Sequence, residues 1–109
     1  MVNNRFPHYM YIKRPLLDEY EQPVLDEKGD PSDVTVFESI CRNYPSSKSI
    51  YAHTVVASDY TVSLPIHSFL IRTGDKIEVR EAVRTLVGIV ADSHVNNLGA
   101  NVWYNFNSN

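Results

Sequence analysis

Hydrophobic and polar residues alternate in short runs along the second half of the chain, a pattern typical of β-strands that bury one face. In the run 76–80, Ile77 and Val79 are expected to face a core, and the charged residues beside them face water. Four such runs are bounded by Pro, Gly, Asp or Asn: Tyr60–Leu64, Lys76–Arg80, Thr85–Val90 and Ala100–Phe106. Their spacing predicts a meander of antiparallel strands that closes into a small barrel or sandwich.

Turn-forming residues separate these runs. Gly74-Asp75 precedes the second run, Asn96-Asn97-Leu98-Gly99 precedes the last, and a third turn is expected at Ala82–Arg84. The stretch 86–90 is apolar on both faces, which predicts a central strand, and Gly88 within it indicates a bulge or a close backbone approach. The residues expected to cap the barrel are Ile66, Phe69 and Leu70.

The first half of the chain is expected to add two more strands. The run 8–12 alternates between two faces, and its pattern does not decide which face is buried. In the run 33–42 neither face is purely apolar, which predicts a bulge or an edge position. The predicted fold class is all-β, a small antiparallel β-barrel (SH3-like or related) in a single domain of residues 1–109, with a long projecting loop.

The connection between these two strands, about residues 16–33, is acidic. Residues 18–30 hold six acids and one base, a net charge of −5. The other residues hold seven acids and nine bases, about +2, which gives the whole chain its net charge of −3. The acids do not match the ligand spacing of a calcium loop, which favours a solvated or partner-facing loop over a cation site. The residues expected at a subunit or partner interface are Tyr9, Tyr11, Asp18, Glu19, Tyr20, Glu21, Asp26 and Glu27.

The segment 43–58 begins as a turn, ends in β-prone residues and carries a single charge, Lys48. A projecting loop fits this composition, and such loops in small domains often carry function. An ordinary edge strand at 50–56 is the open alternative.

Composition excludes several classes of protein. No apolar run approaches the roughly 18 residues of a membrane span, and the first residues lack the apolar core of a signal peptide. The single cysteine, Cys41, fits a reducing compartment and is expected to be a buried apolar residue. The net charge argues against tight binding of nucleic acid by one copy, whereas weak or multivalent contact stays open. We detect no internal repeat and no low-complexity tract.

The chain shows no recognisable catalytic or metal-binding arrangement. The histidines His8, His53, His67 and His94 are not spaced for a zinc site, and the four glycines form no phosphate loop. Asp92-Ser93-His94 places three catalytic residue types together, but neighbours on an extended chain point apart, so a turn after the strand is expected there. We therefore predict a non-enzyme without catalytic residues, metal or cofactor.

The order of several short motifs resembles that of the head-closure proteins (stopper or head–tail joining proteins) of long-tailed bacteriophages. These motifs are Phe6-Pro7-His8, Tyr20 with Pro23-Val24, Cys41-Arg42, the run from Asp59 to Pro65, the run from Thr73 to Val79, and Gly88-Ile89-Val90.

The resemblance implies a β-barrel in a homo-oligomeric ring (hexamer or dodecamer) in the neck of a virion, made in the cytoplasm of a bacterial host. Such rings lie beneath the portal and adaptor, close the DNA channel after packaging, and dock the tail through its terminator or tube, without a membrane. The resemblance places the channel loop at 43–58, with Ser46, Ser47, Lys48, Ser49, Ile50, Tyr51, His53 and Thr54 as gating residues. The low charge of this loop leaves its contact with packaged DNA open, and the acidic connection would meet the adaptor or the next subunit.

Two other interpretations remain open. One is a different virion component with a similar barrel, such as a tail terminator or minor capsid protein. The other is a monomeric small-barrel module that binds a peptide or nucleic acid through Tyr9, Tyr11 and Trp103.

Overall fold

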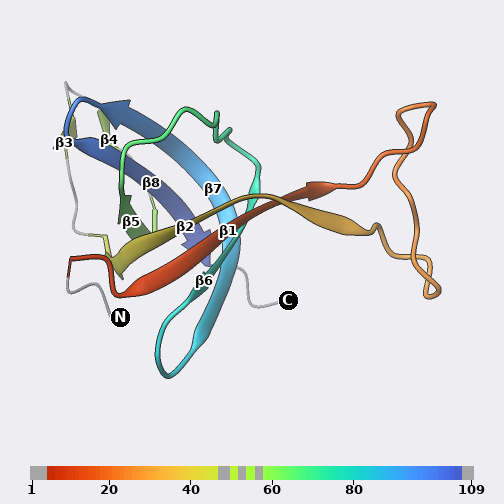
Figure 1. Cartoon of the computed structure of the whole chain (residues 1–109), viewed down its shortest axis with the longest axis horizontal. Helices are drawn as coiled ribbons and strands as arrows, with labels where there is room; N and C mark the ends of the chain where they lie inside the picture. The colour runs from red at the N-terminus through yellow and green to blue at the C-terminus, as the bar shows by residue number, and fades with distance from the viewer. Residues whose placement is uncertain (1–4, 47–49, 52–53, 56–57, 107–109) are drawn as a thin grey trace.

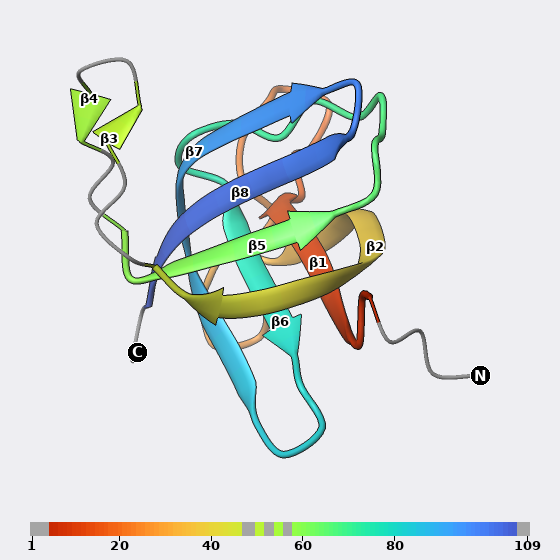
Figure 2. The ribbon, with the colours of Figure 1, turned by 90° about the vertical axis from the view of Figure 1, so that its left-hand side faces the viewer.

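The computed structural model describes residues 5–46, 50–51, 54–55 and 58–106. These residues form eight strands and no helix: β1 (His8–Pro15), β2 (Asp33–Pro45), β3 (Ile50–Tyr51), β4 (Thr54–Val55), β5 (Tyr60–Leu64), β6 (Lys76–Arg80), β7 (Thr85–Asn96) and β8 (Gly99–Phe106). Six of them close an antiparallel barrel in the order β1-β2-β5-β8-β7-β6, while β3 pairs with β4 outside it (Figures 1 and 2). The prediction of a small all-β barrel is confirmed.

The barrel closes because β2 and β7 each pair with different neighbours along different stretches. The first part of β2 pairs with β1 and residues 42–45 pair with β5. In the same way, 85–89 of β7 pair with β6 and 88–96 pair mostly with β8. Each strand carries one unpaired residue, Val36 in β2 and Ala91 in β7. Such bulges bend a strand and increase its twist, which helps a six-stranded sheet curl far enough to close.

The bulge at Val36 explains why β2 showed no purely apolar face. Phe37 pairs with Ile12 on the inside, whereas Thr35 pairs with Lys13 on the outside, so the alternation shifts by one residue at Val36. Cys41 is fully buried, as predicted. The predicted bulge is confirmed, and β2 lies between two neighbours in the closed barrel, pairing with β1 along 33–41 and with β5 along 42–45.

The turn predicted at Asp92-Ser93-His94 is wrong, because β7 continues to Asn96. Asp92 pairs with Trp103 and His94 with Asn101, so pairing with β8 keeps these polar residues extended. The bulge at Ala91 precedes them, and Ser93 donates a hydrogen bond from Oγ to the Ile71 carbonyl at 2.8 Å. The chain turns instead at 97–98, within the predicted Asn-Asn-Leu-Gly turn.

The core fills the barrel from all six strands. On β1, Met10 and Ile12 are fully buried, which leaves Tyr9 and Tyr11 on the outer wall. The core residues are Met10, Ile12, Cys41, Val62, Leu64, Ile71, Ile77, Val79, Val90, Ala100, Val102 and Tyr104. The expectation that Ile66 and Leu70 cap the barrel is wrong, since both are exposed. Phe69, the third expected cap, packs against the core, and Ile71 is buried in place of the other two.

Gly88 marks a close approach of β7 to β8, as predicted. A Cβ at this position would lie 2.2 Å from the backbone oxygen of Asn105 and 2.8 Å from the ring of Tyr104. The ring of Tyr104, the largest fully buried side chain, stacks on Tyr60 with centroids 5.6 Å apart. Glycine at 88 therefore makes room for the largest side chain in the core.

We predict that Gly88→Ala lowers the free energy of unfolding by roughly 2–3 kcal/mol, because the added methyl group must displace backbone. Thermal unfolding followed by circular dichroism measures this loss. Val87→Ala, an outward position on the same strand, is the control and should cost less than about 1 kcal/mol. Equal melting temperatures for Gly88→Ala and the wild type would contradict this account of the core.

Candidate interaction surfaces

Residues 16–32 leave the barrel between β1 and β2 as an arm that ends in two lobes (Figure 1). The two lobes have the same sequence pattern: Leu17-Asp18-Glu19 is followed by Pro23, and Leu25-Asp26-Glu27 by Pro31. The expectation of no internal repeat is therefore wrong, since a unit of Leu-Asp-Glu-x-x-x-Pro-x occurs twice, eight residues apart. We name residues 16–32 the twin-turn arm.

The two turns are also equivalent in hydrogen bonding. Oδ1 of Asp18 accepts bonds from the amides of Tyr20 (2.8 Å) and Gln22 (3.0 Å). Oδ1 of Asp26 accepts bonds from the amides of Lys28 (2.9 Å) and Asp30 (3.0 Å). Isolated bridges, Leu17 with Pro23 and Leu25 with Pro31, close the turns. The positive φ values also correspond, at 61° for Glu21 and 85° for Gly29.

Three backbone hydrogen bonds form a ring at the root of the arm. The amide of Leu16 donates to Ser32 (2.7 Å), that of Ser32 to Val24 (2.7 Å), and that of Val24 to Leu16 (2.8 Å). These positions are eight residues apart, so the ring joins the start, middle and end of the repeat. Both turns are therefore held by main-chain bonds although neither belongs to the barrel sheet.

The twin-turn arm exposes large apolar side chains as well as charge. Leu17 is 51% exposed, Leu25 58% and Tyr20 76%. All six predicted interface residues of the acidic connection lie on this arm and are exposed: Asp18, Glu19, Tyr20, Glu21, Asp26 and Glu27. Two of them, Asp18 and Asp26, have a structural part in the turns that the composition did not indicate.

The other two predicted interface residues, Tyr9 and Tyr11, lie on the outer wall of the barrel rather than on the arm. They line a shallow pocket with 38–40 of β2. The guanidinium of Arg80 lies 4.5 Å from the centroid of the Tyr11 ring. Trp103, in contrast, is only 8% exposed, so it is not part of an open aromatic groove with the tyrosines.

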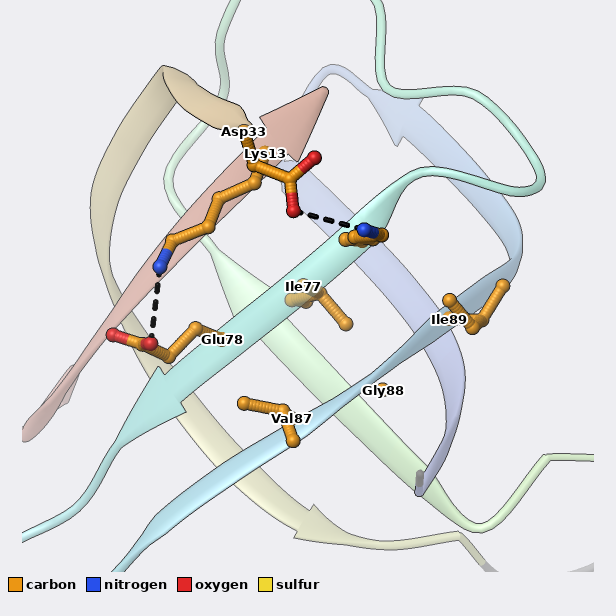
Figure 3. A pocket seen from close by; sticks show the side chains of 8 residues that line it. Lys13, Asp33, Ile77, Glu78, Val87, Gly88 and Ile89 are labelled. Atoms are coloured by element: carbon orange, nitrogen blue, oxygen red, sulfur yellow. Dashed lines mark hydrogen bonds and ion pairs between the residues drawn. The ribbon is translucent and has the colours of Figure 1, made fainter. Parts of the chain in front are cut away.

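A groove of about 260 Å³ runs across the outer wall beside this surface, over β1, β6 and β7 (Figure 3). Val87 and Ile89 supply its apolar part, and two ion pairs border it. Lys13 Nζ lies 3.2 Å from Glu78, and Lys76 Nζ lies 2.8 Å from Asp33. Burial alone would raise the pKa of Glu78, but bonds from Lys13 and Arg80 outweigh burial and lower it.

The ends of the predicted channel loop are held together by hydroxyl groups. Ser46 Oγ lies 2.9 Å from Ser58 Oγ and 2.8 Å from Thr61 Oγ1, and its amide donates to the Asp59 carbonyl. Beyond this clasp, the backbone of β3 pairs with that of β4. Of the predicted gating residues, Ile50 and Tyr51 form β3, Thr54 begins β4, and Ser47, Lys48, Ser49 and His53 lie outside the described residues.

Below this clasp lies a buried polar chain. The Tyr104 hydroxyl donates to Oδ1 of Asn43 at 2.7 Å, and Nδ2 of Asn43 donates to Glu81 at 2.9 Å. Arg84 also bonds Glu81. Burial raises the pKa of Tyr104, and it raises that of Cys41 to about 12 with a smaller contribution from Glu81. Cys41 is therefore a thiol at neutral pH and a poor nucleophile.

At the opposite end, Arg14 and Asp75 form a two-pronged ion pair with both contacts at 2.9 Å. Arg14 also bonds the Leu70 carbonyl and lies over the ring of Phe69. Phe69 stacks on Phe37, which in turn contacts His67 at 4.8 Å. Burial would raise the pKa of Asp75, but Arg14 and the amide of Arg72 lower it overall.

Both ring nitrogens of His67 are buried without a hydrogen-bond partner. Burial lowers the pKa of His67, and a backbone contact with Phe69 that does not meet hydrogen-bond geometry opposes this in part. The folded chain therefore holds His67 neutral more strongly than the unfolded chain does.

Comparison with known proteins adds no relative, since no family model, curated protein or solved structure matches the chain significantly. Among the described residues, no three or more His, Cys, Asp or Glu side chains gather so as to hold a metal ion. The described part of the chain contains no helix long and apolar enough to cross a membrane. The shifted pKa values found above all have packing or ion-pair causes.

We predict that the stability of the wild type falls as pH is lowered from about 7 to 5, because the unfolded His67 binds a proton near its ordinary pKa of about 6.5 and the folded one resists it. His67→Phe should lose this slope, with a difference on the order of a few degrees in melting temperature at pH 5. Asp75, Glu78 and Glu81 also have lowered pKa values. Protonating them reduces stability only below their ordinary pKa values near 4, which lies outside this pH window. His94→Gln, at an exposed position, is the control and should keep the slope; identical slopes in all three proteins would refute the assignment.

Proposed function

We propose that the chain is a structural protein of a phage neck that assembles as a ring below the portal and adaptor, closes the DNA channel and docks the tail. The observation that carries an assembly role is the twin-turn arm, which holds Leu17, Tyr20 and Leu25 in water on main-chain-braced turns. Exposed apolar residues in an ordered projection are typical of interaction sites. The resemblance of the motif order to head-closure proteins selects this kind of assembly.

The barrel supplies a rigid body for such a ring. Weak contacts between copies add up when many copies are held in one closed assembly. Contacts that close a ring need two different patches on each copy. The twin-turn arm and the outer wall of the barrel offer two patches of different chemistry, one acidic and one of mixed charge.

The segment between Ser46 and Ser58 is the proposed channel element. Its two ends meet at the hydroxyl clasp, which lies where β2 ends and β5 begins. A loop with closed ends can project from a barrel without requiring the barrel to move. Repeated around a ring, one such loop from each copy would narrow a central channel that a single copy could not close.

The aromatic surface of Tyr9 and Tyr11 favours no second function by itself. Arg80 already covers Tyr11, and Trp103 does not reach solvent with them. The chemistry proposed here is therefore contact between proteins, with no reaction assigned to the chain.

We predict that replacing residues 47–57 by a short Gly-Ser linker, with Ser46 and Ser58 kept, leaves the barrel folded but prevents filled heads from retaining DNA. The barrel is expected to keep its core because its six strands, together with Ile71, supply the core residues found in the described part of the chain. The measurement is nuclease-resistant DNA in heads assembled with the variant, and the melting temperature of the purified variant is the control for folding. Normal retention of DNA with the shortened segment would remove the gating role.

A further inference from the structure

The twin-turn arm projects away from its own barrel, with the three-bond ring at its root (Figure 1). Its exposed leucines and tyrosine are therefore available for contact with another molecule. Residues 16–32 carry six acids and one base, a net charge of −5, while the rest of the chain carries about +2. The charge of the arm is thus complementary to that of a second copy of the barrel.

Each turn presents the same short epitope. Leu17 and Leu25 are more than half exposed, and each is followed by an Asp that is used within its turn and a Glu that is exposed. An apolar side chain next to a carboxylate requires a receiving site with an apolar floor and a cation on its border.

The groove of Figure 3 has these two properties. Val87 and Ile89 form an apolar stripe on its floor, and Lys13 and Lys76 border it. Its volume of about 260 Å³ falls below the roughly 300–1,000 Å³ of small-molecule sites and suits a protein side chain.

The two lysines can donate hydrogen bonds to a further carboxylate. Lys13 and Lys76 each have a partner, Glu78 and Asp33, but an ammonium group has three N–H donors. Their side chains are 32% and 49% exposed, so an incoming carboxylate can reach them. The site therefore has remaining hydrogen-bonding capacity toward an acid.

We propose that the twin-turn arm of one copy docks in the β1–β6–β7 groove of the next copy, with a turn leucine on Val87 and Ile89 and a turn glutamate at Lys76. This contact joins two different patches, so it is of the kind that generates a ring. It deepens the proposed function by naming the partner of the arm. It rests on that function only in assuming that the ring belongs to a virion.

The test is sedimentation velocity of the full-length purified chain over a concentration series, with three charge variants. Glu19→Lys with Glu27→Lys reverses charge on the arm, and Lys76→Glu reverses charge at the groove. The third chain carries all three changes. The wild type is expected to self-associate, each reversal to weaken association roughly tenfold or more, and the combined chain to recover to within about threefold of the wild type. Recovery is expected because arm and groove again carry opposite charges.

Asp92→Lys, an exposed acid on β7 outside the arm, the groove and the Tyr9–Tyr11 pocket, is the matched control and should associate like the wild type. Melting temperatures of all variants show whether the loss of the Lys76–Asp33 pair affects folding. The inference is overturned if the wild type stays monomeric at high concentration, or if the combined chain associates no more tightly than the weaker of the two reversal variants. Because no phage particle is used, this failure is separate from a failure of DNA retention.

Discussion

Closure of the barrel depends on two strands that each change partner along their length. A six-stranded sheet closes only if its strands bend and stagger enough for the first to meet the last. In this chain β2 and β7 meet that constraint with one bulge each, at Val36 and Ala91. Each bulge lies within the pairing with a single neighbour, Val36 opposite β1 and Ala91 opposite β8, and adds bend and twist to its strand there. The pairing of β1 with β6 completes the closed sheet.

The two ends of the barrel are finished by different chemistry. One end is an ion pair under aromatic rings, where Arg14 joins Asp75 and covers Phe69. The other is a chain of neutral and charged hydrogen bonds from Tyr104 through Asn43 to Glu81. Both keep buried polar atoms satisfied, which a closed barrel of this size needs because its ends cannot be covered by further layers. His67 is the exception among the described residues, and its burial lowers its pKa.

Alternation of residue types predicted much of the fold because most strands bury one face. Ile77 and Val79 on β6 were assigned correctly for this reason. It could not assign the faces of β2, since a bulge shifts the alternation at a residue, Val36, that no local signal marks. It also ended β7 too early, because Asp92 and His94 are polar and only their pairing with β8 keeps them in the strand. The eight-residue repeat of the arm is present in the sequence, but it is much shorter than the repeats of solenoid proteins, so its pattern alone does not indicate a structural repeat.

The three-bond ring of Leu16, Val24 and Ser32 has a consequence for how such an arm can change in length. Chain positions eight residues apart meet at one point, so a whole unit can be removed or inserted there while the strands that flank it keep their places. The reach of the arm is thereby separated from the architecture that carries it. A lineage could alter its contacts in discrete eight-residue steps without redesigning the sheet beneath.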